Sequence, residues 1–113
     1  TDLANAERVH LPRWLDACTG NGHMFYLLMK NIDDRNTFIA YMRDAGIITP
    51  FHYVPLHSAP AGLEYGHVDG PLDVTDNISK RLVRLPMFFD LGSEAETVID
   101  HAHSYFSKEK GGL

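Results

Sequence analysis

The side chains best suited to chemistry in this sequence are its seven histidines, because an imidazole can bind a metal, move a proton or hydrogen-bond an anion near neutral pH. The sequence contains no His-Glu-x-x-His or Cys-x-x-Cys pattern, and His101 and His103 lie two residues apart on an expected helix, where they face different directions. It also lacks a Gly-x-Ser-x-Gly nucleophile elbow and a glycine-rich phosphate loop that opens a helix. We therefore expect no metal site and no catalytic residue in this chain. The histidines are His10, His23, His52, His57, His67, His101 and His103.

Residues 51–57, Phe-His-Tyr-Val-Pro-Leu-His, hold the densest group of such side chains. We expect this segment to leave a strand and enter a proline-stiffened loop, and loops anchored on rigid strands often carry binding groups. There His52, Tyr53 and His57 could hydrogen-bond sugar hydroxyls or phosphates. Spacing alone leaves a second interpretation open, in which the aromatic residues pack in the core and the histidines satisfy backbone groups.

The elements expected to position this segment are short strands and amphipathic helices. A continuous apolar run predicts a strand covered on both sides, and apolar residues every three or four positions predict helices. After an irregular lead-in over residues 9–19, we expect a strand over 23–30, a helix over 31–45 and a strand over 47–53. A loop over 58–72 with a helical turn at 61–65 then leads to a helix from 73 to the residue before Pro86 and an extended piece over 84–88. A last helix is opened by Ser93 and Glu96, which form a capping box.

Length and composition predict one domain over residues 1–113, because 113 residues with 44% hydrophobic content can bury a single core. The expected class is α+β, a two-layer arrangement in which a small sheet has helices packed on one face. The expected core residues of the two longest helices are Phe38, Tyr41, Met42, Ala45, Val98, Ile99, Ala102, Tyr105 and Phe106.

The charge distribution excludes several classes of partner. The formal net charge is −5, and the basic residues are scattered, so we expect no nucleic-acid binding. The longest apolar run, residues 24–29, is far shorter than the roughly 20 residues of a membrane span, so we expect no membrane insertion.

Residues 1–7 lack the features of a secretory signal, and the single cysteine, Cys18, suits a reducing cytoplasm. Because residue 1 is not Met, we expect the chain to be the interior of a longer polypeptide.

Four groups of residues together resemble the C-terminal small domain of the DegT/DnrJ/EryC1/StrS family of pyridoxal-phosphate sugar aminotransferases. Nearly the whole chain is covered by the resemblance. The groups are Asn-Gly-His-Met-Phe-Tyr at 21–26, residues 38–47, His-Tyr-Val-Pro-Leu-His at 52–57 and Arg-Leu-Pro-Met at 84–87. The first and third groups, with Ala-Pro-Ala-Gly at 59–62, are most similar to members that aminate a dTDP-linked sugar for surface glycans such as enterobacterial common antigen.

The resemblance implies fold type I, in which a large domain carries the lysine that binds pyridoxal 5'-phosphate and the small domain closes over the active site. That large domain is absent here, and Lys30, Lys80, Lys108 and Lys110 do not match the family's cofactor lysine. The implied reaction transfers an amino group from glutamate to C4 of a nucleotide-linked 4-keto-6-deoxy sugar. The implied partners are that nucleotide sugar, glutamate, the large domain of the same polypeptide and a second subunit in a homodimer.

By the same resemblance, His52, Tyr53 and His57 border the substrate pocket, with His23 at the start of a buried strand as a further substrate-binding candidate. The chain alone is then expected to be inactive. The alternative from another class is a non-catalytic binding module that uses residues 51–57 and the loop at 64–73 as its surface.

Overall fold

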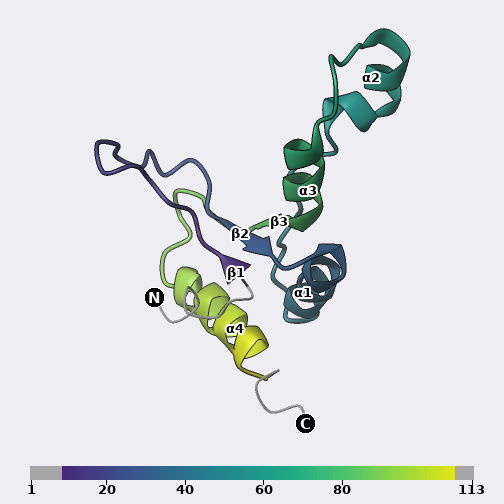
Figure 1. Cartoon of the computed structure of the whole chain (residues 1–113). Coiled ribbons are helices and arrows are strands. Elements are labelled where there is room, and N and C mark those ends of the chain that lie inside the picture. Colours follow the sequence, from purple (N-terminus) through teal and green to yellow (C-terminus); the bar gives the residue numbers. More distant parts are fainter. Residues whose placement is uncertain (1–8, 109–113) are drawn as a thin grey trace.

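A three-stranded antiparallel sheet with helices packed against it forms the body of the molecule (Figure 1). The structure is a computed structural model and describes residues 9–108. The strands lie in the order β1 (Val9–His10), β2 (Tyr26–Met29) and β3 (Leu82–Arg84). In the ladder, Val9 pairs with Met29 in β2, and Leu27 pairs with Val83 in β3. The expected α+β fold is confirmed.

The helices follow local signals closely. They are α1 (Ile32–Asp44), the short 3₁₀ turn η2 (Leu56–Ser58), α2 (Pro60–Tyr65), α3 (Asp73–Arg81) and α4 (Glu94–Lys108). The predicted turn at 61–65 is thus α2, which has Pro60 at its first position, where no backbone N–H is needed.

Helix α1 begins and ends with specific caps. The Asn31 side chain accepts a hydrogen bond from the Asp34 backbone N–H at 2.8 Å, and Gly46 takes a left-handed φ of 78° just beyond the helix end. Ala45, expected to face the core, is exposed because α1 ends at Asp44 and the chain turns outward there.

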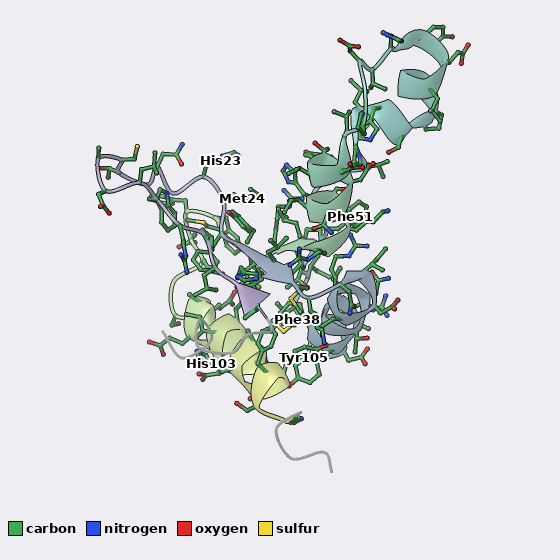
Figure 2. The ribbon with its side chains drawn as sticks, in the orientation of Figure 1. His23, Met24, Phe38, Phe51, His103 and Tyr105 are labelled. Carbon is green, nitrogen blue, oxygen red and sulfur yellow. The ribbon has the colours of Figure 1, made fainter. Side chains whose placement is uncertain are left out.

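The core lies between one face of the sheet and helices α1 and α4. The ring of Phe38 in α1 packs edge-on against the ring of Tyr105, with 5.1 Å between the ring centres, and stacks on the ring of Phe106, with 5.7 Å between the ring centres. Figure 2 shows Phe38 and Tyr105 between the two helices. The expectation for Ile99 is wrong, since it is half-exposed on the outer side of α4. The buried cluster consists of Val9, Leu27, Met29, Phe38, Met42, Ile47, Val83, Val98, Ala102, Tyr105 and Phe106.

Several expected bounds differ from the structure. The strand expected over 23–30 is shorter, the irregular lead-in expected over 9–19 contains β1, and the extended piece expected over 84–88 lies at 82–84 as β3. Two further differences have a clear physical reason. The strand over 47–53 is reduced to one bridge between Phe51 and Val83, because Pro50 cannot donate a ladder hydrogen bond; the Pro50 carbonyl accepts from the Arg84 N–H at 2.8 Å. Helix α3 ends at Arg81 instead of continuing toward Pro86. Pairing with β2 draws the buried Leu82 and Val83 into β3, so tertiary contact overrides the helical spacing.

Residues 56–72, which we name the arm, project away from the body. Figure 1 shows α3 leading outward from the sheet and α2 standing at the far end. The radius of gyration is 16.1 Å, whereas a compact domain of about 100 residues has about 13 Å. Among residues 9–108, no helix combines the length and the hydrophobicity needed to cross a bilayer.

Candidate functional site

Three of the four predicted site residues meet in one cleft at an end of the sheet. This sheet-end cleft has a volume of about 330 Å³, and His23, His52 and Tyr53 all line it. The fourth predicted residue, His57, lies outside it. The complete lining is His23, Met24, Pro50, His52, Tyr53, Arg84, Leu85, Pro86 and Met87.

The two sides of the cleft are brought together by the pairing of β2 with β3. His23 is held on the loop before β2, where its backbone N–H donates to the Asn21 side chain at 3.1 Å; Figure 2 shows it on this loop beside Met24. Arg84 is the last residue of β3, and the next N–H, of Leu85, donates to the Phe25 carbonyl at 3.0 Å. Backbone hydrogen bonds therefore fix the spacing of the cleft walls.

Among residues 9–108, two nitrogens in the cleft are buried without a hydrogen-bond partner. They are Nδ1 of His52 and Nε of Arg84. A buried polar atom left unpaired costs about 1–3 kcal/mol, so nearly all such atoms in folded proteins have a partner. The Arg84 guanidinium carbon lies 5.8 Å from the centre of the Tyr53 ring, and the His52 and Tyr53 rings are 4.6 Å apart. The cleft thus presents a cation, an imidazole and a phenol to a ligand that supplies oxygen atoms.

Arg35 of α1 supports the segment that carries these side chains. Its guanidinium donates to the Ser79 carbonyl of α3 at 3.1 Å and lies 5.4 Å from the centre of the Phe51 ring. Burial lowers the pKa of Arg35 from its usual value. Arg35 therefore joins α1 and α3 beneath the residue that precedes His52.

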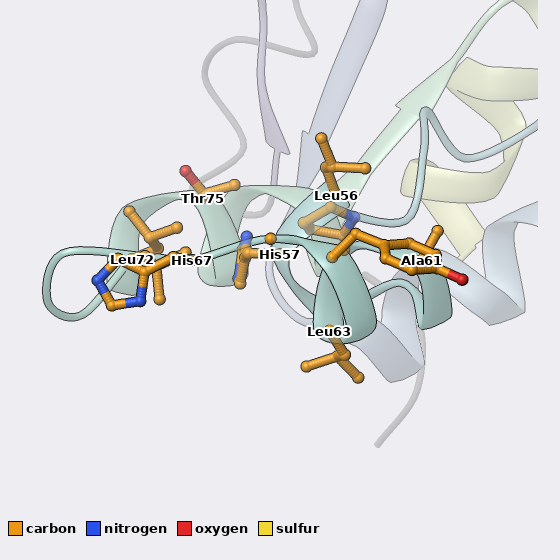
Figure 3. Close-up of a pocket in the computed structure, with 12 residues that line it drawn as sticks. Leu56, His57, Ala61, Leu63, His67, Leu72 and Thr75 are labelled. Carbon is orange, nitrogen blue, oxygen red and sulfur yellow. The ribbon is translucent and has the colours of Figure 1, made fainter.

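His57 lies in a second hollow, inside the arm, with a volume of about 780 Å³. Its Nε2 is 2.8 Å from Oδ1 of Asp76 in α3. Figure 3 shows His57 between α2 on one side and His67 and Leu72 on the other. Most of the lining is apolar, from Pro55, Leu56, Ala61, Gly62, Leu63, Gly66, Val68 and Leu72, and the polar members are His57, Tyr65, His67 and Thr75.

A third hollow, of about 570 Å³, adjoins both of the others. It shares His52 and Tyr53 with the sheet-end cleft and shares Pro55, Leu56 and Thr75 with the arm hollow. Tyr53 is 68% exposed, so the interpretation in which it packs in the core is wrong. The three hollows form a series that an elongated ligand could occupy.

Sequence reasoning missed Arg84, which lines the sheet-end cleft, and Asp76, which contacts His57 from outside the lining of the three hollows. Arg84 was noted only within a matching motif, although a cation that ends the apolar run of Leu82 and Val83 is a signal of a strand end. Asp76 gave no signal, because its contact with His57 spans 19 positions along the chain.

The described residues do not fit a pyridoxal cofactor or a metal by themselves. None of the residues lining the three hollows is a lysine, and Lys30, Lys80 and Lys108 are exposed elsewhere. Lys110 lies outside the described residues. In the described part of the chain, no group of three or more His, Cys, Asp or Glu side chains is arranged to hold a metal ion.

Several solved structures with a similar fold are aminotransferases. The aminotransferase TlmJ from Streptoalloteichus hindustanus is 26% identical with a TM-score of 0.76, over 96% of this chain and 29% of that chain. DesV of S. venezuelae, solved in complex with a ketimine intermediate, shares the fold with a TM-score of 0.79 at 24% identity, over 92% of this chain and 28% of that chain. The architecture is therefore that of a domain found in aminotransferases.

Sequence comparison identifies the family. The DegT/DnrJ/EryC1/StrS aminotransferase family matches residues 1–102, so the chain belongs to that family. A curated relative, a "pleiotropic regulatory protein" of Geobacillus stearothermophilus, is 28% identical over 81 residues, which are 71% of this chain and 22% of that protein. The chain thus spans less than a third of the length of these relatives.

Proposed function

We propose that this chain is the C-terminal small domain of a sugar aminotransferase and that its sheet-end cleft forms one wall of a nucleotide-sugar pocket. The observation that carries the proposal is the pair of buried, unpartnered nitrogens, His52 Nδ1 and Arg84 Nε, in one cleft. A nucleotide sugar offers hydroxyl and diphosphate oxygens, which are suitable partners for an imidazole and a guanidinium. Membership of the aminotransferase family agrees with this role.

The proposed reaction transfers the amino group of glutamate to C4 of a dTDP-linked 4-keto-6-deoxy sugar, as in the transaminase that makes dTDP-4-amino-4,6-dideoxygalactose for surface glycans. The sequence resemblance at residues 21–26, 51–57 and 59–62 supports this substrate. When bound, pyridoxal 5'-phosphate supplies the electron sink for amino transfer. We propose that its lysine belongs to a large domain outside these 113 residues, that the chain alone is inactive and that the complete enzyme is a homodimer.

The residues of this chain have the tasks of binding and orientation in this proposal. The Arg84 guanidinium and the His52 imidazole hold oxygens of the diphosphate or sugar, and Tyr53 covers the ligand with its exposed ring. His23 borders the same cleft from the loop before β2. His57 contacts the part of the substrate that extends along the hollows toward the arm.

The test is an amino-transfer assay on the complete polypeptide that carries this chain, with glutamate and a dTDP-linked 4-keto-6-deoxy sugar. His52→Ala and Arg84→Ala should each raise KM for the nucleotide sugar about tenfold or more, because a hydrogen bond to a charged group contributes about 1.5–3 kcal/mol. KM for glutamate should change much less.

His103→Ala is the matched control, since His103 is a half-buried histidine of α4 outside the cleft. It should leave both KM values unchanged. Absence of amino transfer to the nucleotide sugar would refute the proposed activity. Normal KM values in the His52 and Arg84 variants would refute the site while leaving the family assignment in place.

A further inference from the structure

We propose that Asp76 is a positioning residue for His57, which fixes the orientation of the imidazole and keeps its proton on Nε2. The inference rests on the substrate-binding role proposed above for His57 and deepens it, because it specifies which kind of substrate group His57 receives. That group is a hydroxyl that donates a hydrogen bond, as on a sugar, rather than a phosphate oxygen.

The contact between the two side chains determines the tautomer. Nε2 of His57 lies 2.8 Å from Oδ1 of Asp76, and an ionised carboxylate can only accept hydrogen bonds. The proton of the neutral imidazole therefore resides on Nε2, which leaves Nδ1 with a free lone pair. Within residues 9–108, Nδ1 of His57 has no hydrogen-bond partner, so it can accept one from a ligand.

Hydrogen bonds within α3 hold Asp76, which carries the carboxylate, in place. The Asp76 N–H donates to the Leu72 carbonyl at 2.9 Å, and the Asp76 carbonyl accepts from the Ser79 hydroxyl at 3.2 Å. The His57 side chain is 17% exposed and that of Asp76 44% exposed, so the contact is partly shielded from water and salt. In the described part of the chain, it is the one side-chain hydrogen bond between the arm and α3.

A neighbouring carboxylate provides a matched control. Asp73 lies in the same first turn of α3 as Asp76, carries the same charge and is exposed. His57 contacts Asp76 and not Asp73 in the described structure. Asp73→Ala therefore removes the same charge as Asp76→Ala but keeps the contact between His57 and Asp76.

The first experiment records the imidazole ¹⁵N resonances of His57 by NMR in this chain, labelled with ¹⁵N-histidine, at a pH where the ring is neutral. The expected spectrum has a protonated Nε2 and an unprotonated Nδ1. Asp76→Ala should shift both resonances toward the average of exchanging tautomers, Asp76→Glu should retain the protonated Nε2, and Asp73→Ala should leave the spectrum unchanged. A wild-type spectrum with the proton on Nδ1, or one unaffected by Asp76→Ala, overturns the inference.

The second experiment measures kcat/KM in the complete aminotransferase. His57→Ala and Asp76→Ala should each reduce it, the latter about tenfold, the lower end of the loss seen when the carboxylate that orients a metal-binding histidine is removed. The double variant should be no worse than His57→Ala, since the two residues act as a unit. Additive losses would overturn the positioning role of Asp76.

The two proposals fail in different ways. If His57→Ala leaves the kinetics unchanged, the substrate-binding role of His57 is refuted whatever the NMR result. If His57→Ala slows the reaction and Asp76→Ala changes neither the kinetics nor the tautomer, only the positioning inference is refuted.

Discussion

At the scale of single residues, the guanidinium of Arg84 combines three properties in one position. Arg84 is the last residue of β3, and its guanidinium carbon lies 5.8 Å from the centre of the Tyr53 ring. Among the described residues, its Nε is buried without a hydrogen-bond partner. Its backbone N–H is already used by the Pro50 carbonyl. The side chain is therefore available for a ligand, while the backbone keeps its place in the sheet.

We expect Arg84→Lys to restore only part of the binding lost in Arg84→Ala. A lysine keeps the positive charge but loses the planar arrangement of donors that matches two oxygens of one anion. KM for the nucleotide sugar should lie between those of the wild type and the alanine variant. Equal KM values for the lysine and wild-type enzymes would show that charge alone matters.

The sequence predicted His23, His52 and Tyr53 as site residues, and the structure places all three in one cleft. Their role in substrate binding stays a prediction, which rests on their side-chain types and on the matching motifs. Arg84 could not be placed with them from local pattern, since it reaches the cleft through pairing with β2, more than fifty positions away. The cation that follows Leu82 and Val83 indicates a strand end, but no local pattern indicates which distant residues will lie beside it.

At the scale of elements, helices were easier to predict than strands. Helix α1 carries its own start and stop signals in Asn31 and Gly46, so its bounds agree with the prediction to within a residue. Strands β1 and β3 are two and three residues long, too short for a period of two to appear. Their existence depends on the hydrogen bonds that β2 offers.

Phe38 packs between α1 and α4, so we expect the stability of the body to depend strongly on it. We expect Phe38→Ala to lower the free energy of unfolding by about 3–5 kcal/mol, because it removes a fully buried ring and leaves a cavity. Urea denaturation monitored by circular dichroism measures this loss. Phe89→Ala is the matched control, since Phe89 is fully exposed and its removal should change stability by no more than about 0.5 kcal/mol.

Gly62 allows α2 to pack closely against η2. A Cβ atom at this position would overlap the carbonyl of Leu56, so we expect Gly62→Ala to displace α2 while the core stays folded. Amide NMR shifts should then change within the arm and remain constant in α1 and α4. Ala61→Ser, an exposed neighbour, should have no such effect; shift changes spread over the whole chain would contradict this local role.

At the scale of the whole molecule, large apolar side chains are exposed on the arm as well as on the body. Leu63 and Tyr65 of α2 are 70% and 81% exposed, and α2 contacts η2 rather than the body. Apolar area of this kind usually contacts another protein surface. Under the proposed function, we expect that surface to belong to the large domain or to the second subunit.

We expect the chain in isolation to associate through this area. Replacing both Leu63 and Tyr65 with Glu should lower the average mass seen by sedimentation at high concentration, without changing the midpoint of thermal unfolding. Ile48→Glu is the control, because Ile48 is similarly exposed outside the arm. If the control lowers association to the same extent, the arm has no special part in it.

The two ends of the arm lie close together, beside Asp76 of α3. His57 near its start contacts Asp76, and Leu72 at its end accepts a hydrogen bond from the same residue. The entropy cost of closing a loop rises only slowly with its length, and the core cluster contains no residue of the arm. Evolution can therefore lengthen, shorten or exchange the intervening residues without disturbing the body. Under the proposed function, we expect differences in substrate choice between related enzymes to be concentrated in the arm.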